Sequence, residues 1–385
     1  MPPTIPQWQP LSKNAQQDQL ASYDAQRRQC PVAHSETLHY SVLSHDLASE
    51  VLSDYRCFSN QAGGHLSVPN GMDPPLHGVF RPVIEPYFSA EAMARFRPLC
   101  ADICQQLVSE LKKGQEIDVI GQIAEPFSLQ IQCAFMGWPD SLQTPLRDWL
   151  KANQQAIQVQ DRTRLTQLAN AFDAYIQEQL TLRRQRNYKP GVYDTTWKLL
   201  QDHVQVNGER RLLSDTELVS IIRNWTVGEL GTIAASVGII CCFLARHPAL
   251  QQTLREQPAL LGNGIDEILR IDPPLIANRR KTTMPVMLGG FAIPEGAQIT
   301  LLWAAANRDQ HVFGQDNGYA PEQNKADNLL YGAGIHQCPG APLARMELVM
   351  LTEQLLSQTS KWQLGRTKRA VYPAGGYQRL YLRFD

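Results

Sequence analysis

The sequence predicts a mostly α-helical protein with small β regions. Five long segments repeat apolar residues at the spacing of an amphipathic helix, and most have polar residues at their ends. These segments cover residues 92–113, 141–158, 162–187, 215–246 and 340–358. Runs with strand character are short, and turn residues lie between the central ones. They cover residues 286–292, 298–302 and 379–384, with turns at Gly289-Gly290 and Pro294-Glu295-Gly296.

The chain is long for one domain but shows no internal boundary. Its 385 residues exceed the usual size of a single domain. No Gly/Ser-rich linker, charge block, low-complexity tract or repeat divides the sequence. One large, mostly helical domain with a smaller strand-rich region is therefore expected.

Charge and hydropathy argue against nucleic-acid and membrane partners. Lysine plus arginine total 36 and aspartate plus glutamate total 37, a formal net charge of -1, which gives no general attraction to polyanions. No uninterrupted run of about 18 apolar residues is present, and the N-terminus lacks the basic and apolar regions of a signal peptide. These features predict a cytoplasmic protein without a membrane anchor that does not bind nucleic acid.

Residues 331–340, YGAGIHQCPG, place one cysteine in a glycine-rich bend just before a helical segment. A thiol at a helix N-terminus lies near unpaired backbone N–H groups and the positive end of the helix dipole, which favours the thiolate. Gly332, Gly334 and Gly340 permit close approaches that a side chain would block. A flat, bulky group could therefore lie against the backbone beside Cys338.

This segment resembles the haem-binding loop of the cytochrome P450 superfamily, F-G-x-G-x-H-x-C-x-G, with Tyr331 in place of the phenylalanine. The resemblance implies the triangular cytochrome P450 fold, with haem b as the cofactor and Cys338 as the axial iron ligand. It also implies that Tyr331, Gly332 and His336 line the cofactor. By the same resemblance, residues 1–385 form a single haem-thiolate domain with no fused reductase.

Four further segments match the family in the same order along the chain. Glu267 and Arg270 form its E-x-x-R motif, in which opposite charges three apart meet on one helical face, with Arg308 expected as a third member of this structural cluster. Arg280 stands where the family directs an arginine from a strand to a haem propionate. Alternation along the strand then leaves Arg279 on the opposite face.

The third segment, residues 72–81, looks like the family's D-P-P-x-H-x-x-x-R. His77 and Arg81, spaced i and i+4, would share a helical face and provide two donors for propionate oxygens. Together with Arg280 and His336 they would form a basic clamp. Pro82 departs from the pattern and is expected to bias Arg81 away from helical angles.

The segment 215–246 corresponds to the family helix that crosses the distal face of the haem. Family members carry an adjacent acid and threonine here, whereas Glu229 and Thr232 are three apart in this sequence. Aligning Thr232 with the family threonine puts Gly231 in the acid position, and aligning Gly228 as the kink glycine puts Gly231 in the threonine position. In either register Glu229 and Thr232 would be the catalytic pair that delivers protons to bound dioxygen. The plainer alternative is a helix-facing threonine and a solvent-facing glutamate.

The resemblance implies a monooxygenase that inserts one oxygen atom into a small organic substrate by hydroxylation, epoxidation or O-dealkylation. A thiolate ligand favours O–O cleavage. Electrons would come from a ferredoxin or flavodoxin with an NAD(P)H-dependent reductase, docking near Cys338 where Arg81, Arg279 and Arg345 supply positive charge. Three alternatives stay open: a peroxide-driven or non-oxidative haem-thiolate enzyme, a non-catalytic haem-binding protein, and a helical protein without haem.

Overall fold

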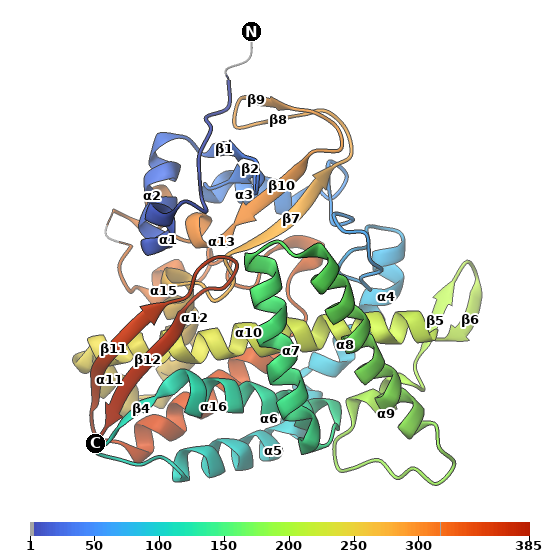
Figure 1. Ribbon diagram of the computed structural model, residues 1–385, viewed down its shortest axis with the longest axis vertical. Coiled ribbons are helices and arrows are strands. Elements are labelled where there is room, and N and C mark those ends of the chain that lie inside the picture. The colour runs from blue at the N-terminus through green and yellow to red at the C-terminus, as the bar shows by residue number, and fades with distance from the viewer. Residues whose placement is uncertain (1–3, 316) are drawn as a thin grey trace.

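The computed structural model describes residues 4–315 and 317–385, which form a broad helical part and a smaller part built around a five-stranded sheet (Figure 1). The helices up to the middle of the chain are α1 (Lys13–Gln17), α2 (Gln19–Gln29), α3 (His45–Ser53), α4 (Leu76–Ile84), α5 (Ala90–Ser109), α6 (Glu125–Met136), α7 (Gln143–Gln158), α8 (Arg162–Arg183), α9 (Thr195–Leu199) and α10 (Asp215–Arg246). The later helices are α11 (Pro248–Glu256), α12 (Leu261–Ile271), α13 (Trp303–Ala306), α14 (Gln310–Phe313), α15 (Pro321–Asn324) and α16 (Ala341–Gln358). Five short helical turns of other types are η1 (Glu85–Phe88), η2 (Ile120–Ala124), η3 (Asp140–Leu142), η4 (Pro258–Leu260) and η5 (Gly334–His336).

The largest sheet joins segments from both ends of the sequence. Its order is β1-β2-β10-β7-β3, from strands β1 (Val32–Ser35), β2 (His39–Val42), β3 (Phe58–Ser59), β7 (Ala277–Thr282) and β10 (Gln298–Leu302). A second sheet has the order β11-β12-β4, from β4 (Glu116–Asp118), β11 (Trp362–Arg369) and β12 (Tyr377–Phe384). Two hairpins complete the strands, β5 (His203–Val206) with β6 (Glu209–Leu212) and β8 (Val286–Leu288) with β9 (Phe291–Ile293).

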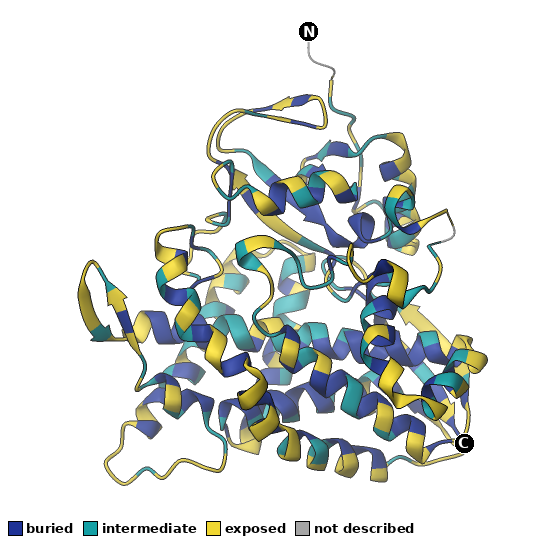
Figure 2. Cartoon of the chain, turned by 180° about the vertical axis from the view of Figure 1, so that it is seen from behind, coloured by how far each residue is buried: buried dark blue, intermediate teal, exposed yellow. Residues whose placement is uncertain are grey.

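Helix α10 is the central element of the helical part. A capping box formed by Ser214 and Glu217 begins it, because each side chain satisfies the other residue's free backbone N–H group. It packs against α6, α8, α12 and α16, and most of its residues are buried (Figure 2). By length and composition α10 is apolar enough to cross a membrane, although its apolar residues do not form one uninterrupted run. However, 61% of the most apolar 18-residue stretch of this helix is buried inside the protein, as expected for a core helix.

All five predicted long helices are present, with ends shifted by at most a few residues. The segment at 92–113 is α5, 141–158 is α7, 162–187 is α8, 215–246 is α10 and 340–358 is α16. Two of the three predicted strands are also present, as β10 and β12. The run 286–292 is wrong as a single strand, because Gly289 and Gly290 both adopt positive φ and turn the chain into the β8–β9 hairpin.

The elements that the sequence analysis missed are either fully buried or very short. Helix α6 buries residues all around its surface, among them Phe127, Gln132 and Phe135, so it lacks the polar face on which a helical pattern depends. Strands β1 and β2 are four residues each, and β2 joins the sheet by pairing with β10, a chain segment more than 200 residues away. This sheet matters for the site because β7 carries Arg280.

Candidate functional site

The bend before α16 holds Cys338 in a tight backbone loop. The amide of Cys338 donates to the carbonyl of Tyr331 at 2.8 Å, which closes the loop. Gly332 and Gly334 have φ angles of +71° and +70°, a region that other residues rarely adopt. A Cβ on Gly334 would lie 2.7 Å from the carbonyl oxygen of Leu52, so only glycine fits there. The glycine-rich sequence therefore shapes the loop as predicted.

The charge state of Cys338 differs from the expectation drawn from the helix terminus. Hydrogen bonds from the backbone N–H groups of Gly340 and Ala341 do lower the pKa of the thiol, as predicted. Desolvation by the surrounding protein atoms has the larger effect, so the pKa of Cys338 is raised overall although the residue is exposed at the surface of the site. In the protein alone the thiol is therefore the favoured form, and a bound metal cation would be needed to hold the sulfur as a thiolate.

Tyr331 is held by two residues that the motif does not include. Its hydroxyl donates to Asp266 at 3.3 Å, and the guanidinium of Arg345 lies 4.5 Å from the ring centre. Arg345 also donates to Asp266 at 2.7 Å. The hydroxyl that distinguishes tyrosine from phenylalanine thus has a partner on α12, and the same carboxylate pairs with Arg345, whose side chain stays 48% exposed. Nothing in the sequence pattern indicated Asp266.

The four predicted clamp residues lie together. The rings of His77 and His336 are 4.5 Å apart between centroids. His77 and Arg280 are buried, at 5% and 6% exposure, whereas Arg279 on the opposite face of β7 is exposed, as strand alternation predicts. Burial and the nearby charges of His77, Arg280 and Arg81 lower the pKa of His336 to about 3. Burial likewise lowers the pKa of Arg280 to about 10, which indicates an electropositive cluster.

This cluster is incomplete without an anion. The Nε2 atoms of His77 and His336 are buried and have no hydrogen-bond partner among the described residues. Among the described residues, Arg280 donates only to a backbone carbonyl, that of Arg279, at 2.8 Å. The carboxylate of Asp73 stays 3.9 Å from His336 and accepts hydrogen bonds from Ser59 and Asn60 instead. Unsatisfied buried donors of this kind fit the propionate groups of haem b.

Helix α4 corrects the expectation for Arg81. The helix continues through Pro82 to Ile84, and Arg81 stays helical, so the proline does not divert it. Its guanidinium pairs with Glu85 at 2.9 Å, and its charge contributes to lowering the pKa of both His77 and His336. Arg81 therefore belongs to the cluster while one of its donors is already used.

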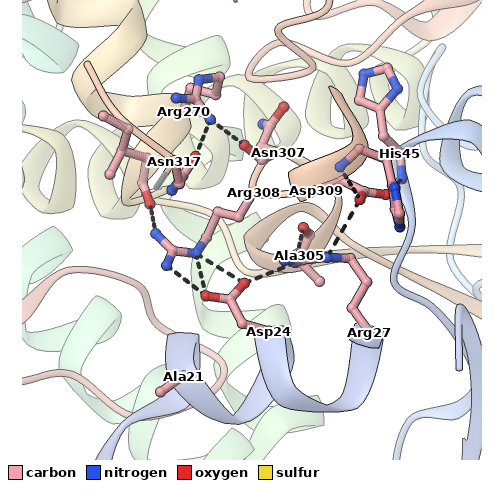
Figure 3. Close-up of polar contacts among 12 residues, drawn as sticks. Ala21, Asp24, Arg27, His45, Arg270, Ala305, Asn307, Arg308, Asp309 and Asn317 are labelled. Atoms are coloured by element: carbon pink, nitrogen blue, oxygen red, sulfur yellow. Dashed lines mark hydrogen bonds and ion pairs between the residues drawn. The ribbon is translucent and has the colours of Figure 1, made fainter. Parts of the chain in front are cut away.

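The E-x-x-R pair is buried and bidentate. Arg270 Nε and a terminal nitrogen each donate to Glu267 at 2.8 Å, and both side chains are at most 1% exposed. Arg270 also donates to Asn307 and Asn317, at 2.6 and 2.5 Å (Figure 3). Arg308 does not join this pair directly. It donates to Asp24 on α2 at 2.7 Å and to the carbonyl of Ile271 at 2.6 Å, so it ties α2 to the end of α12.

One face of α10 remains open in the middle of an otherwise buried helix. Val227 and Gly228 are exposed, and Gly231 and Thr232 are half-buried one turn later. A Cβ at Gly228 or Gly231 would meet nothing within 4 Å. The Thr232 hydroxyl donates to the carbonyl of Gly228 at 2.5 Å, so it bonds to its own helix. The helix is continuous across both glycines.

The carboxyl group of Glu229 is buried and not solvent-facing. It lies next to that of Glu347 on α16, and no basic residue contributes to the pKa of either group. Burial raises the pKa of Glu229 to about 7 and that of Glu347 still further, because two carboxylates cannot both be charged there. Glu347 was missed because a glutamate on an amphipathic helix ordinarily faces water, yet it is 0% exposed.

A polar clasp fastens the loop before α4 to α10. Asn224 donates to the Val68 carbonyl at 3.1 Å, and the Val68 amide donates to Ser220 at 2.8 Å. Arg223 bridges further, donating to the Leu66 carbonyl at 3.2 Å and to Asp173 on α8 at 2.7 Å. The loop at residues 66–68 is therefore held between α8 and α10, beside the open face of the helix.

Comparisons with known proteins agree with this arrangement. The profile of the family described as Cytochrome P450 matches residues 142–364. The chain is 28% identical over 296 residues to cyclomarin C epoxidase of Salinispora arenicola, covering 75% of this chain and 73% of that protein. It is 27% identical to 6-deoxyerythronolide B hydroxylase of Saccharopolyspora erythraea, over 76% and 70% of the two chains. The structure of CYP109Q5 from Chondromyces apiculatus superimposes with a TM-score of 0.85 at 23% identity, covering 99% of each chain.

The family profile spans more than half of the chain, and the solved structure shows the same triangular fold. The family's cofactor is haem b, which the unsatisfied basic cluster and the Cys338 loop can accommodate. Epoxidases and hydroxylases are among the relatives. The chain therefore belongs to the cytochrome P450 family and is a haem-dependent monooxygenase.

Proposed function

We propose that this protein hydroxylates, epoxidises or O-dealkylates a small organic substrate, with Cys338 as the axial ligand of haem b. The observation that carries the proposal is the pair of orphaned imidazole nitrogens on His77 and His336 beside buried Arg280, in the same site as the Cys338 loop. Such a set of donors costs stability unless an anionic group binds there. The haem supplies an iron centre that activates dioxygen, and a thiolate ligand favours O–O cleavage.

In this proposal each of the predicted site residues has a defined role. His77, Arg81, Arg280 and His336 bind the propionates, and the bend at Gly332 and Gly334 lets the macrocycle approach the backbone. Tyr331 packs beside the loop, fixed by Asp266. Glu267 and Arg270 stabilise the segment that precedes the loop, and Arg308 ties α2 to α12.

Proton delivery is assigned to Thr232 and to the buried carboxyl pair. A group that donates protons near neutral pH needs a pKa in that range, and burial raises the pKa of Glu229 to about 7. Thr232 lies on the open face of α10, where rotation of its hydroxyl away from Gly228 would present a donor to the distal side. Glu347 holds the proton that Glu229 passes on.

We further propose that residues 1–385 act as one haem-thiolate domain served by a separate ferredoxin or flavodoxin and an NAD(P)H-dependent reductase. The match over 99% of both chains with one solved structure supports the single domain. A cytoplasmic location is supported by eight cysteines that are all free. For docking, Arg279 is an exposed charge beside the site, whereas Arg345 is paired with Asp266.

The test is the absorption spectrum of the haem-loaded protein, reduced with dithionite, with and without carbon monoxide. Wild type is expected to show the strongly red-shifted Soret band of thiolate-ligated haem, and Cys338→Ser is expected to lose it. Cys57→Ser is the control, because this half-buried thiol lies outside the loop. Retention of the band in Cys338→Ser would overturn the assignment of the ligand.

A peroxide-driven reaction is the second candidate, and the bonding of Thr232 to its own helix favours it. Thr232→Ala separates the two. Under the main proposal the variant consumes reductant but releases much of it as peroxide, with product formation falling about 100-fold, the range of a lost proton donor. If peroxide drives the reaction, product formation with added peroxide stays unchanged in Thr232→Ala and reductase-driven turnover is negligible in wild type.

A further inference from the structure

A chain of aromatic side chains connects the Cys338 loop to the protein surface. Gly340, two residues after the cysteine, lies between the Cys338 sulfur and the ring of Phe88, because a Cβ built on it would be 3.8 Å from each. Phe88 meets Trp225 of α10 edge to face at 5.2 Å between centroids. Trp225 in turn lies 5.3 Å from Tyr87. These three rings are called the aromatic path below.

Tyr87 ends this path at a proton acceptor. Its ring is 2% exposed, and its hydroxyl donates to Asp202. Burial raises the pKa of the Asp202 carboxyl, which makes it a better proton acceptor than an exposed aspartate. Tyr87 and Asp202 both line a surface pocket of about 280 Å³, together with Lys198 and His203. Small solutes can therefore approach the end of the path from solvent.

The three rings of the aromatic path differ in how easily they are oxidised. Phenylalanine is difficult to oxidise. Phe88 is therefore not itself oxidised, and it only fills the space between the sulfur and the indole. Tryptophan and tyrosine can each lose one electron. The ammonium group of Lys198 lies 4.6 Å from the Tyr87 ring and opposes a positive charge on it. Oxidation of Tyr87 therefore requires that its proton leave at the same time, and Asp202 is in position to accept it.

We propose that Phe88, Trp225 and Tyr87 form a route by which an unused oxidising equivalent leaves the haem site and is quenched at the surface. This function is additional to substrate oxidation and rests on the haem-thiolate assignment of the site. It would protect the haem and Cys338 when no substrate is present to be oxidised.

The electrons and protons balance in three steps. With haem bound and oxidised by peroxide, the indole of Trp225 would supply one electron to the cofactor and become a radical cation. Tyr87 then reduces that radical by one electron while its phenolic proton moves to Asp202, leaving a neutral tyrosyl radical and a protonated carboxyl group. A one-electron reductant of the thiol or enediol class, entering the surface pocket, restores the phenolate, which takes its proton back from Asp202.

Tyr193 provides a matched control within the same aromatic cluster. It contacts Phe135 at 5.7 Å and Phe96 at 4.9 Å, and Phe135 stacks on Phe88 at 5.7 Å. In the described residues, however, no carboxylate accepts a hydrogen bond from its hydroxyl, and only phenylalanines separate it from Phe88. If proton acceptance decides where the radical settles, Tyr193 should not hold it.

The experiment mixes substrate-free holoprotein with hydrogen peroxide and freezes it rapidly for electron paramagnetic resonance. Only preparations that show the thiolate Soret band are used, so a failure of the haem-thiolate assignment would be evident beforehand. Wild type is expected to give a tyrosyl radical. Tyr87→Phe and Trp225→Phe should lose the tyrosyl signal, Asp202→Asn should weaken it, and Tyr193→Phe should leave it unchanged.

A second readout locates the radical without relying on turnover. A nitroso spin trap added during the peroxide reaction should be recovered by mass spectrometry on the peptide that contains Tyr87, and the haem of Trp225→Phe should bleach faster than that of wild type. A tyrosyl signal that persists in Tyr87→Phe, one that disappears in Tyr193→Phe, or the absence of any protein radical in wild type would each overturn the proposal.

Discussion

Burial determines the charge of the individual residues around the haem site. It lowers the pKa of His77, of His336 and of Arg280, and it raises the pKa of Cys338, so the protein alone disfavours every charge that the cofactor needs there. This is the pattern of a site whose residues are chosen for binding at a cost in stability. The cost makes the assignment testable apart from turnover.

Replacement of Arg280 by leucine should have opposite effects on the free protein and on the complex. The lowering of the Arg280 pKa from 12.5 to about 10 corresponds to a penalty on the order of 3 kcal/mol in the haem-free state. Arg280→Leu is therefore expected to raise the free energy of unfolding of the haem-free protein. Loss of a charge-assisted hydrogen bond should speed haem release about tenfold or more.

Denaturant unfolding of the haem-free protein and transfer of haem to an acceptor protein measure these two effects. Arg279→Leu is the control, because its side chain is exposed on the other face of β7 and should change neither quantity. A haem-free Arg280→Leu protein that is less stable than wild type would indicate a structural role for this arginine instead.

The carboxyl pair of Glu229 and Glu347 should make stability depend on pH. Since burial raises the pKa of both, the folded state binds more protons than the unfolded state between about pH 4.5 and pH 7. Stability contributed by the shared proton is thus fully present below the unfolded pKa and lost as the pH rises through the folded pKa. Glu347→Gln is expected to remove most of this loss, on the order of 1–3 kcal/mol.

Unfolding of wild type and Glu347→Gln at pH 5 and pH 8 tests this expectation. Glu353→Gln on the same helix is the control, because Glu353 is exposed and should keep the pH dependence of wild type. Equal slopes in wild type and Glu347→Gln would mean that the two carboxyl groups are not coupled.

At the scale of elements, α10 joins the site to the surface loops. Its open face carries Gly228, Gly231 and Thr232. Its N-terminal third fastens residues 66–68 through hydrogen bonds from Ser220, Arg223 and Asn224 to the carbonyls of Leu66 and Val68. The loop is held by only a few hydrogen bonds to its backbone, so its opening should cost little free energy compared with unfolding. The clasp is therefore a candidate control on ligand entry.

Arg223→Ala should loosen the loop with little effect on the fold. The ion pair with Asp173 is partly exposed, so its loss is expected to cost at most about 1 kcal/mol of stability. The bond to the Leu66 carbonyl is lost as well, and a bound haem ligand such as an azole should dissociate several-fold faster, as followed by stopped-flow absorption. Arg184→Ala removes another ion pair between the end of α8 and α10, with Asp215, but does not touch the loop. Equal dissociation rates in both variants would exclude a role for the clasp.

At the scale of the whole molecule, buried polar residues connect the helical part to the sheet-containing part. Glu267 on α12 accepts a hydrogen bond from Ala320. Arg270 donates to Asn307 and Asn317, while Arg308 and Asp24 connect α2 (Figure 3). The two groups are neighbours, but their burial differs: Arg270 is 0% exposed and Arg308 is 17% exposed. The cost of breaking each should differ accordingly.

Arg270→Ala is expected to destabilise the protein by about 3–5 kcal/mol, because it leaves Glu267 charged and buried without its partner. Arg308→Ala should cost less, since water can reach Asp24. Thermal unfolding and the fraction of protein recovered with bound haem measure both. If Arg308→Ala proved as damaging as Arg270→Ala, the two groups would form one network rather than two.

The sequence by itself determined the features that depend on the spacing of residues close together in the chain. Five long helices follow from apolar periodicity, and the Cys338 loop follows from glycines whose positive φ angles the bend requires. Strand alternation predicts that Arg279 and Arg280 face opposite sides, and the family pattern identifies Arg280 as the inward one, which is the buried residue of the two. Only short-range geometry is needed for such features, so the order of residues is sufficient to predict them.

Tertiary structure alone decided which distant groups meet. Glu229 faces Glu347 from 118 positions earlier in the chain, Tyr331 binds Asp266, and Tyr87 binds Asp202. Pro82 did not divert Arg81, because packing of α4 outweighed the local preference. Each of these outcomes depends on how helices pack and on what burial does to a charge, and neither is encoded in the spacing of residues along a single element.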